Sequence, residues 1–71
     1  MKRQAVKSSN IKSVGYDPAK QLLEVEFGSG GVFHYHKVSP QAHAALLKAK
    51  SIGTHFHAKI RGRHKATEAS E

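Results

Sequence analysis

Cysteine is absent from this 71-residue chain. Its absence excludes a disulfide framework and thiolate zinc ligands, and it fits a reducing compartment, so the cytoplasm is the expected location. No apolar run approaches the roughly 18 to 20 residues that span a bilayer, and no run of signal-peptide length follows the basic first residues. We therefore expect a soluble protein without a membrane segment.

Acidic residues are scarce. Five Asp and Glu stand against twelve Lys and Arg, which gives a formal charge of +7 with histidine neutral. The six histidines add positive charge below about pH 6.5. A positive field of this strength attracts polyanions, so RNA or another polyanion is the expected class of partner. At this length the chain can hold only one domain.

A hairpin is the clearest element that the sequence predicts. Apolar and acidic residues alternate over 23–27, which places three apolar side chains on one sheet face and two carboxylates on the other. The glycine-rich segment 28–31 can form a tight turn, and residues 32–38 are rich in β-formers. These patterns predict a hairpin over residues 22–38.

A further strand is expected over residues 9–16, ahead of the hairpin. The odd spacing of its apolar residues favours a β-bulge near Gly15. Asp17 and Pro18 then supply the chemistry of a turn. Residues 1–8 are polar and basic, and we expect them to form a flexible arm.

Helix signals follow the hairpin. Ser39 suits the N-cap and Pro40 the first helical position. Apolar residues spaced from Ala42 to Ile52 would face the sheet, and Gly53 is the expected stop. A short second helix is favoured over residues 54–61.

The predicted fold class is α+β, a three-stranded antiparallel β-meander packed against one α-helix, with a short second helix or turn near the C-terminus. The folded domain is expected to span residues 9–62. Residues 63–71 lack large apolar side chains, and we expect them to form a disordered tail.

Several short motifs occur in an order and spacing that are typical of a known domain. They are Ser8-Ser9-Asn10-Ile11, Val14-Gly15-Tyr16-Asp17, Leu23-Glu24-Val25-Glu26-Phe27, Phe33-His34-Tyr35, and Ala49-Lys50-Ser51-Ile52-Gly53 followed by Phe56 and Ile60-Arg61. Over residues 8–64 the chain resembles the KTSC domain, which occurs at the C-terminus of some lysyl-tRNA synthetases and as a free-standing short protein. The resemblance implies a small β-β-β-α fold and a connection with nucleic acid, and it implies no reaction.

The chain departs from the pattern of that family at two positions. The family's central Tyr-x-Tyr motif begins here with Phe33, which keeps the ring and loses a hydroxyl. His57 stands where the family commonly has asparagine after the late aromatic residue. Recognition through those two polar groups is therefore not carried over to this chain.

Basic residues are the main candidates for binding nucleic acid. Contacts to phosphate give salt-sensitive affinity without reading the sequence. The amino-terminal arm adds Lys2, Arg3 and Lys7. The candidate contacts to phosphate are Lys12, Lys37, Lys59, Arg61, Arg63 and Lys65.

Tyr35 is the candidate for stacking on a base. The alternative interpretation places Tyr35 and Phe33 in the core beside Phe27, because alternation puts both on one face of their strand. Chains this short have few other large residues to bury, which favours the core.

Metal binding and catalysis find little support. His34, His36, His55 and His57 form two i, i+2 pairs that could in principle surround zinc or nickel, but structural zinc sites usually include thiolates, and solvent-facing strand histidines are the expected alternative. No nucleophile-elbow serine or complete Walker motif is present. We therefore predict no metal, no cofactor and no enzymatic activity.

The leading hypothesis is a module that binds RNA or single-stranded nucleic acid through phosphate contacts. The alternative is an adaptor that docks on an acidic surface of a nucleic-acid enzyme, such as RNA polymerase or a tRNA synthetase, through the edge of its sheet. The protein partner in this alternative would belong to the transcription or translation machinery.

Overall fold

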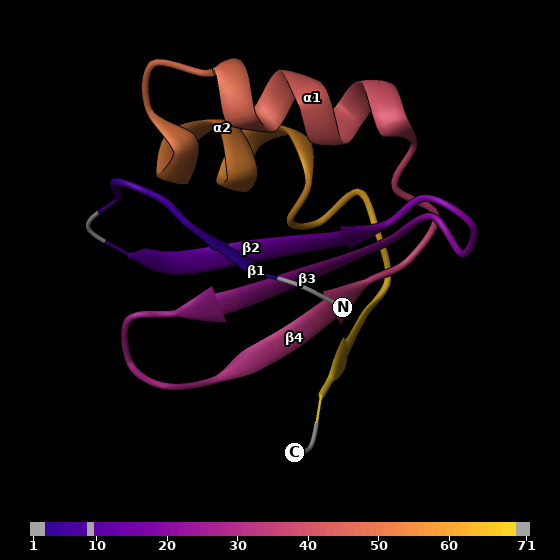
Figure 1. Cartoon of the computed structure of the whole chain (residues 1–71), viewed down its shortest axis with the longest axis horizontal. Helices are drawn as coiled ribbons and strands as arrows, with labels where there is room; N and C mark the ends of the chain where they lie inside the picture. Colours follow the sequence, from indigo (N-terminus) through magenta and orange to yellow (C-terminus); the bar gives the residue numbers. More distant parts are fainter. Residues whose placement is uncertain (1–2, 9, 70–71) are drawn as a thin grey trace.

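The computed structural model of the chain describes residues 3–8 and 10–69. Its elements are β1 (Arg3–Ala5), β2 (Ile11–Asp17), β3 (Leu22–Phe27), β4 (Val32–Tyr35), α1 (Pro40–Lys48), α2 (Ile52–Lys59) and β5 (Ala66–Glu68). The strands form one antiparallel sheet in the order β1-β2-β3-β4-β5. Both helices cover the same face of this sheet (Figure 1). None of the described helices is long and apolar enough to cross a membrane.

The expected α+β class is confirmed, but the expected count of three strands is wrong because the sheet has five. The two extra strands, β1 and β5, lie at its edges. They come from residues 1–8 and 63–71, which we expected to form an arm and a tail. Most of their residues are exposed. A three-residue edge strand is held by backbone hydrogen bonds and buries few side chains, so it leaves no hydrophobic pattern in the sequence.

The predicted hairpin and the start of the first helix are confirmed. The turn between β3 and β4 contains Gly30 at φ 106°, a conformation that favours glycine. The Ala42 backbone N–H donates to Ser39 Oγ at 3.1 Å, and Pro40 occupies the first turn of α1. The bulge in β2, however, lies between Ile11 and Ser13 rather than near Gly15.

The second predicted helix is also confirmed, but Gly53 does not end the first one. Helix α1 ends at Lys48, and Ser51 caps α2 by accepting a hydrogen bond from the Thr54 backbone N–H at 3.3 Å. Gly53 therefore lies inside α2 and is buried. A Cβ at this position would lie 3.2 Å from Ser8 Oγ, so glycine allows α2 to approach the loop before β2 closely.

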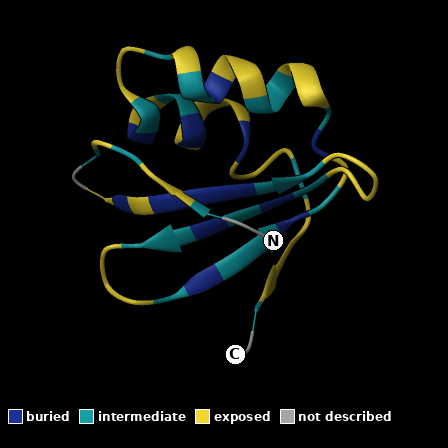
Figure 2. Ribbon diagram, viewed as in Figure 1, coloured by how far each residue is buried: buried dark blue, intermediate teal, exposed yellow. Residues whose placement is uncertain are grey.

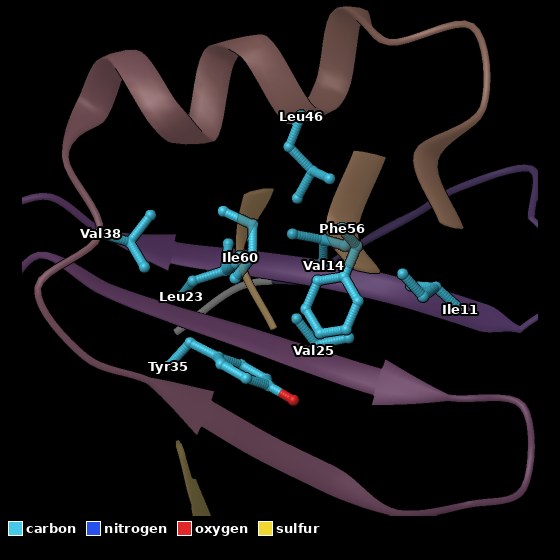
Figure 3. Close-up of a cluster of buried hydrophobic side chains, with 9 residues drawn as sticks. All are labelled: Ile11, Val14, Leu23, Val25, Tyr35, Val38, Leu46, Phe56 and Ile60. Carbon is cyan, nitrogen blue, oxygen red and sulfur yellow. The ribbon is translucent and has the colours of Figure 1, made fainter. Parts of the chain in front are cut away.

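The core lies between the sheet and the two helices (Figures 2 and 3). Phe56 of α2 is fully buried and points toward the sheet. Its ring packs edge-to-face on Phe27 and Tyr35, with centroid distances of 5.6 and 5.0 Å. The buried cluster consists of Ile11, Val14, Leu23, Val25, Tyr35, Val38, Leu46, Phe56 and Ile60.

Helix α1 also contacts the sheet through an aromatic stack. The rings of Tyr16 and His43 lie 4.4 Å apart between centroids and 13° from parallel. The Tyr16 hydroxyl donates to the Val38 carbonyl oxygen. Burial lowers the pKa of His43 and, with a smaller effect of the Asp17 charge, raises the pKa of Tyr16. The neutral form of His43 is therefore the one that the fold favours.

Replacing His43 with phenylalanine should remove one source of acid sensitivity while keeping a ring against Tyr16. The pKa of His43 lies below its ordinary value of 6.5 in the folded protein, so the unfolded chain binds the proton more tightly. The free energy of unfolding of the wild type should therefore fall, relative to that of H43F, as the pH drops below about 6.5. Urea denaturation across this pH range measures the difference, and a constant difference would contradict the assignment.

Candidate functional site

A hollow of about 550 Å³ lies at the end of the sheet where β4 leads into α1. Three permanent cations and two imidazoles line it, and its lining includes no carboxylate. We call it the basic hollow. Its lining residues are His36, Lys37, Arg63, His64, Lys65 and Thr67.

Hydrogen bonds between the end of β4 and the segment that contains β5 build this hollow. The His36 backbone N–H donates to the Lys65 carbonyl oxygen at 2.9 Å. His64 Nδ1 lies 3.0 Å from the His36 carbonyl oxygen, and Thr67 Oγ1 lies 2.9 Å from His36 Nε2. Because these bonds fix residues 63–67 beside β4, cations that are far apart in the sequence surround one volume.

Lys37 adopts an unusual backbone conformation at the rim of the basic hollow. Its φ angle is 59°, in the left-handed region that residues other than glycine rarely adopt. Gln21 in the neighbouring turn has φ 51°, and its carbonyl oxygen accepts the Val38 N–H at 2.8 Å. Strained backbone of this kind is often found at functional sites.

The carboxylates of β3 lie on the open face of the sheet and have partners there. Glu24 Oε1 lies 3.3 Å from Arg3 Nη1, and Glu24 Oε2 lies 2.8 Å from His34 Nε2. Glu26 Oε1 accepts a hydrogen bond from Ser13 Oγ at 2.8 Å. Glu24 is paired with Arg3 and His34, and Glu26 with Ser13. These two carboxylates therefore do not compensate the positive charges of the basic hollow.

A second hollow lies at the opposite end of the sheet, where the loop before β2 meets the β3–β4 turn and α2. It has a volume of about 470 Å³ and is lined by Asn10, Phe27, Gly28, Ser29, His57 and Arg61. A neighbouring hollow of about 320 Å³ shares Asn10 and His57 with it and adds Lys7 and Lys50. We call the two together the helix groove. Within it, Arg61 Nη1 lies 3.4 Å from His57 Nδ1.

The six predicted phosphate contacts fall into three groups. Lys37, Arg63 and Lys65 surround the basic hollow. Arg61 lines the helix groove. Lys12 and Lys59 are exposed and line neither of these sites. Of the basic residues of the expected arm, Lys7 lines the groove, and Lys2 lies outside the described residues.

Tyr35 does not present its ring for stacking on a base, because only 5% of the residue is exposed. Its ring lies in the core against Phe56, and Phe33 packs partly buried against the same core, 5.8 Å from the Phe27 ring. The interpretation of these residues as core is therefore confirmed. Burial raises the pKa of Tyr35, and the Arg61 charge lowers it in part.

The four histidines considered as metal ligands lie in two separate places. His34 and His36 belong to β4 and its end, and they bond to Glu24 and Thr67. His55 and His57 lie on α2. Among the residues that the structure describes, no group of three or more His, Cys, Asp or Glu could hold a metal ion.

Sequence reasoning missed several residues that line these sites. His64 and Thr67 line the basic hollow only because β5 pairs with β4, and no hydrophobic pattern indicated that pairing. Asn10 and Lys50 line the helix groove because α2 packs on the loop before β2. The amino-cap at Ser51 was a signal in the sequence that would have placed Lys50 at the start of α2.

This chain is similar to known proteins in both sequence and fold. The model of a family described as the KTSC domain matches residues 7–64. An uncharacterized protein of Stutzerimonas stutzeri is 48% identical over 64 residues, which cover 90% of each chain. A lysine–tRNA ligase of Nostoc punctiforme is 40% identical over 62 residues, which cover 87% of this chain and 11% of the ligase. The crystal structure of a KTSC domain protein from Yersinia pestis is 36% identical with a TM-score of 0.94, and the match covers 97% of both chains.

Replacing Lys37 with glycine should relieve the backbone strain at the rim of the basic hollow. Glycine adopts positive φ without the steric cost that other residues meet, so K37G should be about 1 kcal/mol more stable to unfolding than K37A. Both variants lose the same charge, which makes K37A the matched control. Urea denaturation checks this, and equal stability of the two variants would show that Lys37 is not strained.

Proposed function

This chain belongs to the KTSC domain family, and we propose that it is a non-enzymatic module that binds single-stranded RNA through phosphate contacts at the basic hollow. The observation that carries the proposal is the convergence of Lys37, Arg63 and Lys65 on one hollow whose lining includes no carboxylate. A lysine–tRNA ligase contains a unit similar to this chain, which makes RNA a fitting polyanion.

The chemistry of the hollow suits a phosphate backbone. The Arg63 guanidinium can donate two parallel hydrogen bonds to one phosphate, and the lysines act as point charges beside it. Binding releases counterions, so the affinity falls steeply with salt and carries no sequence information by itself. The imidazoles of His36 and His64 add ring nitrogens to the lining of the hollow.

The open face of the sheet is less suited to RNA. Glu24 and Glu26 both lie on it, and their carboxylates repel phosphate. The large aromatic rings of β3 and β4 are packed on the opposite side, toward α2, as Phe27 and Tyr35 are against Phe56. We therefore place the RNA strand at the end of the sheet rather than across its open face.

The adaptor hypothesis shares the positive field but needs a docking edge. Strand addition would use β1 or β5, the two edges of the sheet, and each of these strands has only three residues. Short edge strands give a partner few backbone hydrogen bonds. We therefore favour RNA over a protein partner.

Removing two cations from the basic hollow should lower the salt dependence of RNA binding. Fluorescence anisotropy with a labelled single-stranded oligoribonucleotide gives the association constant at several salt concentrations. For R63Q/K65Q, the negative slope of log K against log salt should become less steep by about 1.4, since each phosphate contact on a single strand contributes about 0.7 to its magnitude.

The matched control is K20Q/K48Q, which removes two exposed cations that line neither the basic hollow nor the helix groove. Its slope should stay close to that of the wild type. Absence of binding at low salt, or equal losses in the two double variants, would contradict the proposal. Equal losses would mean that only the net charge matters.

A further inference from the structure

The helix groove differs from the basic hollow in its chemistry. Its larger part combines an aromatic wall from Phe27, the carboxamide of Asn10 and the planar guanidinium of Arg61. Its smaller part adds the ammonium groups of Lys7 and Lys50. One end of the groove is therefore built from flat and hydrogen-bonding groups, and the other from point charges.

Arg61 is available to a ligand. Its side chain is exposed, and within the described residues it makes no ion pair with a carboxylate. Its contact with His57 Nδ1 is long, at 3.4 Å, so a ligand that binds the guanidinium breaks no strong hydrogen bond. A guanidinium plane of this kind stacks on nucleobases as well as pairing with phosphates.

The backbone holds Arg61 in place at the groove. The Arg61 backbone N–H donates to the Phe56 carbonyl oxygen at 2.8 Å, directly after α2. Phe56 is fully buried and contacts Phe27, so the aromatic wall and the segment that contains Arg61 belong to one packed unit. A ligand would therefore meet a groove whose wall is already positioned.

We propose that the helix groove binds one nucleotide of a single-stranded RNA, with the base against Arg61 and Phe27 and the phosphate near Lys7 and Lys50. Asn10 and His57 then offer hydrogen bonds to the edge of the base. This inference rests on the proposed RNA binding and adds a second contact point. The β3–β4 turn at the groove and the end of β4 at the basic hollow lie at opposite ends of the sheet, and Arg61 of the groove stands two residues before Arg63 of the hollow.

The test compares three probes by nuclear magnetic resonance: a short oligoadenylate, an inorganic polyphosphate of similar charge and a short polyglutamate peptide. Oligoadenylate should shift the signals of the Phe27 ring, the Asn10 side-chain amide and Arg61 Nε through the ring current of the base. Polyphosphate carries no ring, so it should shift the amides of the basic hollow and leave the Phe27 ring unchanged.

A substitution that keeps the charge isolates the role of the guanidinium plane. R61K should weaken oligoadenylate binding about tenfold, which corresponds to the loss of one stacked base, and leave the affinity for polyphosphate unchanged. R63K makes the same change in the basic hollow and is the matched control. It should change the affinities for both probes by the same factor.

The outcomes separate the two proposals. Salt-dependent RNA binding that leaves the groove signals unshifted overturns the nucleotide site and leaves the proposed function standing. No RNA binding at low salt overturns both. Polyglutamate that shifts the groove signals as strongly as oligoadenylate also overturns the nucleotide site and assigns the groove to an acidic peptide.

Discussion

The pairing of β5 with β4 holds the basic C-terminal segment against the sheet. Ala66, Thr67 and Glu68 lie opposite Tyr35, His34 and Phe33, and the bond between the His36 N–H and the Lys65 carbonyl oxygen extends the ladder. Without this pairing, Arg63 and Lys65 would be charges on a solvated tail. With this pairing, Arg63 and Lys65 line the same hollow as Lys37. Three positive charges are therefore concentrated in one place.

The charges of the domain are sorted by place. Glu24 and Glu26 lie on the open face of the sheet with partners of their own, whereas basic residues gather at its two ends. The aromatic side chains serve mainly to join α2 to the sheet, and Phe27 alone among them lines the larger part of the helix groove. We therefore propose a phosphate contact in the basic hollow and a base contact in the helix groove.

The elements with a side-chain pattern could be predicted from the sequence. The hairpin follows from the alternation over residues 23–27, and the start of α1 follows from Ser39 and Pro40. The family could be predicted as well, because its motifs lie within the packed part of the chain.

The elements without such a pattern could not be predicted. β1 and β5 are held by backbone bonds to their neighbours, so the predicted count of three strands is wrong. For the same reason the sequence indicates the cations of the basic hollow and not their convergence. The sequence predicts a helix stop at Gly53 because it does not show how closely α2 approaches Ser8. The site was therefore predictable in its residue types and not in its shape.

The central claim is that the C-terminal segment binds RNA as part of the sheet. The most direct measurement follows backbone amide signals during a titration with single-stranded RNA. The account predicts that the amides of His36 and Lys37 shift together with those of residues 63–67 and give one dissociation constant. Shifts confined to residues 63–67, with the amides at the end of β4 unchanged, would contradict it.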